Sequence, residues 1–106
     1  MSGNFKFTDK ENDIEGHLRN KVKLLGGKAY KWASPGNRGV PDRIVIIPGA
    51  RGGRVYFIEL KAPGKEPRPQ QLNKQKELKK LGVYVDTLDT KEKINRFIER
   101  VVNYEI

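Results

Sequence analysis

The sequence predicts an α/β domain in which helices pack on a mixed four-stranded sheet. Near both ends of the chain, apolar residues recur three or four positions apart, which is the spacing of an amphipathic helix. Between them lie short runs rich in valine, isoleucine and aromatic residues, bounded by glycine and proline, as is typical of strands. With 106 residues, we expect residues 1–106 to form a single domain with one modest core.

The first helix is predicted to begin near Thr8, because Thr8 followed by Glu11 forms a capping-box pattern. Its apolar stripe consists of Ile14, Leu18, Val22 and Leu25. Two glycines at residues 26–27 end this helix, and the alternating residues 29–33 favour a strand.

A pair of strands should follow the Gly- and Pro-rich loop of residues 34–41. Residues 43–47 are nearly all Ile and Val, as expected of a central strand that is covered on both faces. After the turn of residues 48–54, residues 55–61 form the next strand, so the two strands are expected to pair as a hairpin.

The last third of the sequence predicts a helix, a strand and a helix. A basic, proline-rich loop (62–70) leads into a helix from about residue 70 to residue 81, and residues 83–88 read as a fourth strand. Asp89 and Glu92 offer a second capping box. The stripe of the final helix is Ile94, Phe97, Ile98, Val101 and Val102. The predicted order is therefore αβββαβα, a mixed sheet with helices packed on it.

The composition indicates an anionic partner. Lys and Arg number 22 against 13 Asp and Glu, a formal net charge of +9. Nucleic acid is the commonest partner of so basic a domain, and a membrane surface is the next. The membrane is the weaker option because the sequence has neither a long apolar segment nor a lipidation motif.

Several other classes of site and location are excluded or disfavoured. The absence of cysteine rules out disulfides, zinc–thiolate centres and cysteine nucleophiles. His17 is the single histidine, so one chain cannot build a multi-histidine metal site. The N-terminus has no apolar signal core, and we therefore expect a cytoplasmic protein, or a nuclear one if the source has a nucleus.

Charged residues occur where the two hairpin strands should lie side by side. Glu59 and Lys61 are two residues apart and share one face of their strand with Val55 and Phe57. An ionised carboxylate in such surroundings needs a partner, either Lys61 or a metal ion. Asp42 opens the preceding strand, and a hairpin would bring it beside Glu59.

Two carboxylates with loop carbonyls and water can hold Mg²⁺, which could bind a phosphate oxygen and activate a water. Lys61 could orient that water or stabilise charge on the phosphate. The alternative is that Asp42 belongs to an ordinary turn and that Glu59 and Lys61 form an ion pair on a solvated strand. Spacing alone leaves both interpretations open.

The residues around these charges carry a family resemblance. Pro41-Asp42 and, after sixteen residues, Glu59-Leu60-Lys61 match the PD-(D/E)xK nuclease pattern. YKWASPGNRGVPDRIVIIPG, VYFIELKAPG, PRPQQL and LKKLGVYV together resemble the VRR-NUC family over roughly residues 8–100. The tripeptide that names the family is not present literally, although the catalytic pattern is complete.

The resemblance implies a restriction-endonuclease-like fold and DNA cleavage that depends on Mg²⁺, with Mn²⁺ as a substitute. Small stand-alone members of bacterial or phage type look like homodimeric enzymes that resolve four-way (Holliday) junctions, and larger relatives carry the module within a repair nuclease. Carried onto this sequence, the pattern makes Asp42 and Glu59 metal ligands and Lys61 the catalytic lysine.

The family also uses a glutamate of the first helix, for which this sequence offers Glu11 and Glu15. Both fall on or beside the apolar stripe, and their i, i+4 spacing sets like charges against each other unless a cation lies nearby. Helix capping would account for Glu11, and an ion pair with Arg19 would account for Glu15. We prefer Glu15, because capping already explains Glu11.

Gln71 is the last predicted member of the site. Leu72, Leu78 and Leu81 define an apolar arc on the second predicted helix, and Gln71 lies near the centre of that arc. Its amide should face the sheet and needs hydrogen-bond partners. It matches the glutamine that follows the E-x-K strand in the family and would position a water or a carboxylate. The alternative is a satisfied core amide.

Polar and basic residues around the site suit contacts to phosphate, which give affinity without sequence preference. The predicted contacts are Ser34, Asn37, Arg38, Arg43, Lys65 and Arg68. Tyr30 and Trp32 could stack on an unpaired base, although a place in the core is the commoner role of such a pair on a strand.

Together these features predict a metal-dependent, structure-selective DNA endonuclease whose products carry 5′-phosphate and 3′-hydroxyl ends, as the resemblance implies. One chain offers one site, and cutting a four-way junction symmetrically needs two, so we expect a C₂ dimer. The alternatives are a nuclease that trims flaps or nicks duplexes, a non-catalytic nucleic-acid-binding module and an RNA-binding protein.

Overall fold

The computed structural model of the chain describes residues 11–106. Within this range the elements follow the predicted order αβββαβα. They are α1 (Glu11–Leu24), β1 (Lys28–Lys31), β2 (Arg43–Ile47), β3 (Arg54–Leu60), α2 (Pro69–Lys80), β4 (Tyr84–Leu88) and α3 (Lys91–Val102). The predicted fold class, an α/β domain with a mixed sheet, is confirmed.

The four strands of the described region form one sheet in the order β1-β2-β3-β4. The first three are antiparallel, and β4 joins β3 in parallel after the crossover through α2. The hairpin register pairs Arg43 with Ile58 and Ile47 with Arg54. The start of β2 and the end of β3 therefore lie at the same end of the sheet, as the hairpin prediction required.

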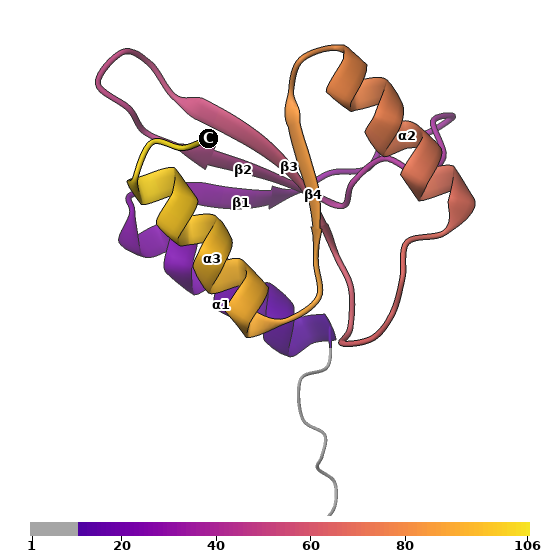
Figure 1. Cartoon of the computed structure of the whole chain (residues 1–106), viewed down its shortest axis with the longest axis horizontal. Helices are drawn as coiled ribbons and strands as arrows, with labels where there is room; N and C mark the ends of the chain where they lie inside the picture. Colours follow the sequence, from indigo (N-terminus) through magenta and orange to yellow (C-terminus); the bar gives the residue numbers. More distant parts are fainter. Residues whose placement is uncertain (1–10) are drawn as a thin grey trace, which may run out of the picture.

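One face of the sheet carries the apolar core. Helices α1 and α3 lie side by side on this face, with α2 on the opposite side of the sheet (Figure 1). Strand alternation points Val45, Tyr56 and Ile58 toward them, and each is at most 2% exposed. The helical side chains that they meet are Ile14, Leu18, Val22, Ile94, Phe97 and Val101.

The opposite face is covered less completely. Helix α2 packs mainly along β4, and Gln75 is its buried residue. Of the apolar arc predicted for this helix, Leu72 is 46% and Leu81 is 73% exposed, and Leu78 is partly buried. Ile46 of β2 is also exposed, so this strand is fully covered on one face only, which corrects the prediction of two covered faces.

The helix starts differ in part from the predicted caps. Thr8, the expected cap of α1, lies outside the described residues. Thr90, and not Asp89, is the N-cap of α3, since its hydroxyl accepts a hydrogen bond from the Lys93 backbone N–H at 3.0 Å. Asp89 instead forms an ion pair with the Lys93 side chain at 2.9 Å. Among the described residues, no helix combines the length and apolar character needed to cross a bilayer.

Candidate active site

Asp42 occupies the junction of three strands. It lies directly before β2, and its Oδ1 accepts a hydrogen bond of 2.9 Å from the backbone N–H of Leu60, at the end of β3. Its backbone oxygen accepts a second bond, of 2.8 Å, from the N–H of Trp32, which follows β1. Burial raises the pKa of Asp42, and the bond from Leu60 partly opposes that rise. The carboxylate is thus fixed beside Glu59 by the strand register.

Glu59 is a buried carboxylate with polar partners on one side only. It is 4% exposed, and its Oε2 accepts a 3.1 Å hydrogen bond from the Gln71 amide and lies 3.4 Å from the Lys61 ammonium. Oε1 is also buried and has no hydrogen-bond partner among the described residues. Burial and the negative charge of Asp42 raise the pKa of Glu59 to about 7, and Lys61 and the nearby backbone N–H of Asp42 lower it in part.

The amide of Gln71 connects the first turn of α2 to Glu59. Its Oε1 accepts a 2.7 Å hydrogen bond from the backbone N–H of Arg68, and its Nε2 donates to Glu59. One turn further on, Gln75 donates a 2.8 Å hydrogen bond to the hydroxyl of Thr87 in β4. Sequence reasoning missed Gln75, although its i, i+4 relation to Gln71 was a usable signal.

The two candidate glutamates of α1 differ in their surroundings. Glu15 forms an ion pair with Arg43, a side chain that is only 6% exposed. Glu11 is exposed, and its charge contributes to the raised pKa of Asp42. In residues 11–106, no group of three or more acidic, histidine or cysteine side chains gathers closely enough to hold a metal ion. The ion pair with Arg43 engages the carboxylate of Glu15. Asp42 and Glu59 are thus the two carboxylates that lie together where β2 begins and β3 ends.

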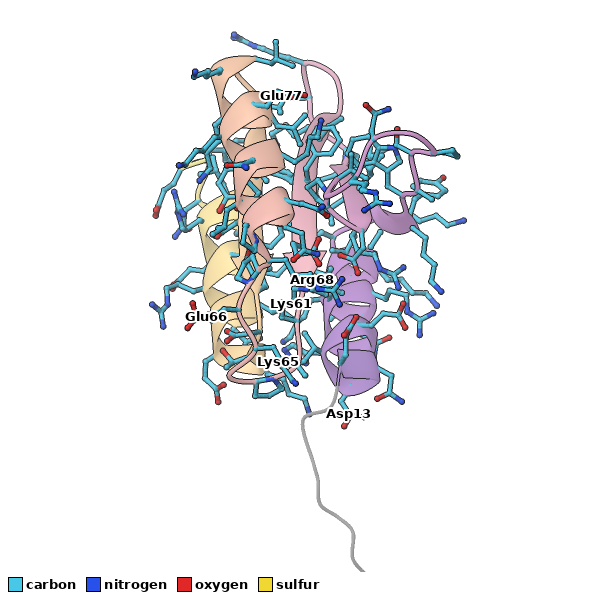
Figure 2. All side chains as sticks on the ribbon, turned by 90° about the vertical axis from the view of Figure 1, so that its right-hand side faces the viewer. Asp13, Lys61, Lys65, Glu66, Arg68 and Glu77 are labelled. Carbon is cyan, nitrogen blue, oxygen red and sulfur yellow. The ribbon has the colours of Figure 1, made fainter. Side chains whose placement is uncertain are left out.

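A cavity of about 560 Å³ opens beside Asp42, and Glu59 is not among the residues that line it. Glu11, Glu15 and Asp42 contribute acidic groups to its wall, and Lys31 and Trp32 line another part of it. In the view of Figure 2, Lys61 and Arg68 lie between the ribbons of α1 and α2, and Asp13 marks the first turn of α1. The cavity gives solvent and a ligand access to Asp42.

The predicted phosphate contacts fall into two groups. Asn37, Arg38, Lys65 and Arg68 are exposed, and the Asn37 amide donates a 3.0 Å bond to the Ser34 hydroxyl. Arg43 differs, because it points into the protein and pairs with Glu15. In this structure Arg43 holds α1 against β2 and leaves almost no surface for a phosphate.

The loop before Asp42 also contacts the start of α2. Gly39 has a φ of +84°, and a Cβ atom there would lie 2.5 Å from the backbone oxygen of Gln70. Glycine is needed at this position both for the left-handed conformation and for the close approach. The contact connects the segment that carries Asp42 to the turn that carries Gln71.

Comparisons with known proteins point in one direction. No protein-family model matches the chain. The protein named "Putative nuclease p44", from Acyrthosiphon pisum secondary endosymbiont phage 1, is 47% identical over 83 residues, which is 78% of this chain and 86% of that protein. A solved structure described as "VRR_NUC domain" superposes with a TM-score of 0.76 at 28% identity, and the match covers 87% of this chain and 97% of that one.

Proposed function

Because the chain belongs to the VRR-NUC family of nucleases, we propose that it is a divalent-metal-dependent endonuclease that hydrolyses phosphodiester bonds in DNA. The observation that carries this proposal is the buried Glu59 carboxylate beside Asp42, with one oxygen that has no partner in the described chain. A buried polar atom without a hydrogen bond is costly, and here it lies where catalysis would need a ligand.

The two carboxylates suit a hard cation. Mg²⁺ is commonly bound by one or two carboxylates together with water and substrate phosphate, so a third acidic residue is not required. Burial and, second to it, the negative charge of Asp42 raise the pKa of Glu59, and a nearby cation would favour the ionised form of both carboxylates. When bound, such a cation would polarise a phosphate oxygen and lower the pKa of an attacking water. We propose Mg²⁺, with Mn²⁺ as a substitute.

The chain's own groups have separate roles in this proposal. Lys61 lies 3.4 Å from Glu59 and is 17% exposed, so its ammonium can reach a phosphate at the site and stabilise the charge that develops there. Gln71 fixes the orientation of Glu59. Glu11 is a better candidate than Glu15 for assisting from α1, because the carboxylate of Glu15 is engaged by Arg43.

We further propose that the substrate is branched DNA and that the enzyme acts as a homodimer on four-way junctions. The net charge of +9 and the exposed side chains of Arg38, Lys65 and Arg68 support a polyanionic ligand. One chain contributes one pair of carboxylates, and two symmetric cuts need two pairs related by a two-fold axis. A flap-trimming or nicking nuclease would need one chain only.

The test is a cleavage assay on linear, flapped and four-way DNA, with Mg²⁺, Mn²⁺ or EDTA. We expect cutting with either metal, none with EDTA, and a preference for the four-way substrate. Glu59→Ala should abolish cutting and leave DNA binding intact or stronger, since it removes negative charge near the phosphates. Glu77→Ala is the matched control, because Glu77 is an exposed glutamate of α2 with a lysine neighbour.

Two results would overturn parts of the proposal. Identical behaviour of Glu59→Ala and wild type on every DNA would rule out the enzyme and favour a binding module. Stronger binding to RNA than to DNA at matched salt would rule out DNA as the substrate. Sedimentation of the free protein and of its complex with four-way DNA tests the dimer.

A further inference from the structure

Two aromatic side chains at the end of β1 lie on the same face of the sheet as the carboxylates of Asp42 and Glu59. Tyr30 and Trp32 are two residues apart, so they point to one side of the sheet. The Trp32 ring packs on Phe57 with 5.1 Å between the ring centroids, and Phe57 precedes Glu59 by two residues on β3. An aromatic strip therefore leads from β1 to the carboxylate of Glu59.

Tyr30 is close to the site and open to solvent. It pairs with Ile44 in the sheet, two residues beyond Asp42, which is about 7 Å along the strand. Neighbouring nucleotides of a stacked strand are about 3.4 Å apart, so Tyr30 is one or two nucleotides from a phosphate held at Asp42. The side chain is 47% exposed, contrary to the expectation that it belongs to the core.

Cations accompany these rings. The Lys28 ammonium lies over the Tyr30 ring, 4.8 Å from its centroid. Lys31 and Trp32 both line the cavity beside Asp42. Aromatic rings beside cations are the combination with which proteins bind single-stranded nucleic acid, because a base has a π-face and its phosphate is an anion.

We propose that Tyr30 and Trp32 stack on the unpaired bases next to the cut, so that the site selects DNA with unpaired or splayed nucleotides. This inference rests on the proposed nuclease function and specifies its substrate. A second copy of the chain is a poorer occupant of this surface, because it would bring another net charge of +9 against Lys28 and Lys31. A polyanion is complementary in charge to the same surface.

Trp32 provides the experimental probe, since it is the only tryptophan in the sequence. Wild-type protein in EDTA and Glu59→Ala in Mg²⁺ are titrated with DNA that carries an unpaired flap and with a blunt duplex of equal length. Stacking predicts quenching of the tryptophan fluorescence by the flapped DNA and little quenching by the duplex. We expect Tyr30→Ala to weaken binding of the flapped DNA about tenfold and binding of the duplex hardly at all. Tyr30→Phe should keep the preference, because the ring remains.

Tyr104→Ala is the matched control. Tyr104 is 73% exposed and also has a cation over its ring, the Arg54 guanidinium at 4.4 Å, but it follows α3 and does not line the cavity. It should bind both DNAs like wild type. A Tyr30→Ala protein that binds both DNAs like wild type would overturn the proposal, as would a change of its oligomeric state, which would make this face a contact between copies.

The same titrations separate the two proposals. They measure binding without cutting, so a protein that discriminates through Tyr30 but cuts no DNA would overturn the nuclease function alone. A protein that cuts DNA and shows no dependence on Tyr30 would overturn the stacking role alone.

Discussion

The two faces of the sheet are built from different chemistry. Beneath α1 and α3, the contacts are mostly aliphatic and aromatic, and residues such as Ile14, Ile94 and Val101 are completely buried. The Arg43–Glu15 ion pair lies at one end of this face. Beneath α2, buried Val85 is accompanied by amides, a hydroxyl and a carboxylate, with Gln71 and Gln75 reaching Glu59 and Thr87. The face beneath α1 and α3 thus holds most of the apolar core, and the face beneath α2 holds the buried carboxylate of Glu59.

This difference teaches how a small domain can tolerate a buried carboxylate. Burying Glu59 beside Asp42 costs free energy, and the apolar contacts of the opposite face offset that cost without touching the site. Substitutions on the α2 face should therefore change activity more than stability, and those on the α1 and α3 face should do the reverse. Each prediction below tests this separation.

The largest effect is expected for Asp42→Asn. The amide oxygen of asparagine can still accept the hydrogen bond from Leu60, so the fold should be kept while the charge is lost. We expect a loss of about 10³-fold in kcat with a melting temperature close to wild type. Asp42→Ala should lose a similar activity and, in addition, ~1–3 kcal/mol of unfolding free energy, because the Leu60 N–H loses its partner. Near-wild-type activity of Asp42→Asn would contradict the role of its charge.

Ile94→Ala tests the other face. Ile94 is fully buried between α3 and the sheet, and truncating such a side chain costs ~2–5 kcal/mol of unfolding free energy. The folded fraction should keep the wild-type kcat, measured well below the melting temperature. Leu24→Ala is the control, because Leu24 is 80% exposed and its loss should cost less than about 0.5 kcal/mol. A selective fall in kcat would mean that the two faces are not separate.

Gly39→Ala should affect both properties, because Gly39 contacts the start of α2. Gly39 and Gly36 have nearly the same φ, +84° and +83°, but a Cβ at Gly36 would have no neighbour within 4 Å. Gly36→Ala therefore reports the cost of the left-handed backbone alone, ~1 kcal/mol. Gly39→Ala should cost about 2 kcal/mol or more, and it should reduce activity about tenfold by displacing Gln71. Denaturant unfolding and initial rates of the two variants decide this, and equal values would rule out the contact as a determinant.

A pH dependence of stability in metal-free buffer is expected as well, with no residue changed. The pKa of Glu59 is about 7 in the folded protein and 4.5 as its ordinary value. Between these pH values the folded state keeps a proton that the unfolded state has lost, so the unfolding free energy falls as the pH rises through this window. Relative to Glu59→Gln, wild type should lose about 3 kcal/mol between pH 4.5 and pH 8. Urea unfolding of both proteins in EDTA measures the difference, and a constant or rising difference would contradict it.

The sequence predicted the frame of the site because strand alternation and hairpin pairing are local rules. Asp42 and Glu59 had to meet once residues 43–47 and 55–61 were recognised as neighbouring strands, and the hydrogen bond from Leu60 to Asp42 confirms that meeting. The prediction that Gln71 faces the sheet is confirmed by its bond to Glu59. Its stated reason holds only in part, because Leu72 and Leu81 are exposed and Leu78 alone of the three leucines is partly buried.

The features that were missed depend on tertiary contacts. Arg43 lies in a basic stretch and was expected to contact phosphate, but it shares its strand face with Val45 and Ile47 and is buried with them. The same alternation rule could have revealed this. The partner of Arg43 could not be read from the sequence, since its choice of Glu15 depends on how α1 packs across the sheet. Tyr30 was expected in the core, and its exposure follows from the limited reach of α2.

The amide of Gln71 makes the two oxygens of the Glu59 carboxylate differ in their hydrogen-bonding roles. Because the oxygen of this amide faces the backbone N–H of Arg68, its NH₂ group must face Glu59, and rotating the amide by 180° would break both bonds. Oε2 of Glu59 therefore accepts a hydrogen bond from the NH₂ group of Gln71. A proton that Glu59 takes up must then reside on Oε1. In Glu59→Gln, the NH₂ group of the new side chain would take the position of Oε1. The two oxygens of this carboxylate are chemically distinct before any ligand arrives.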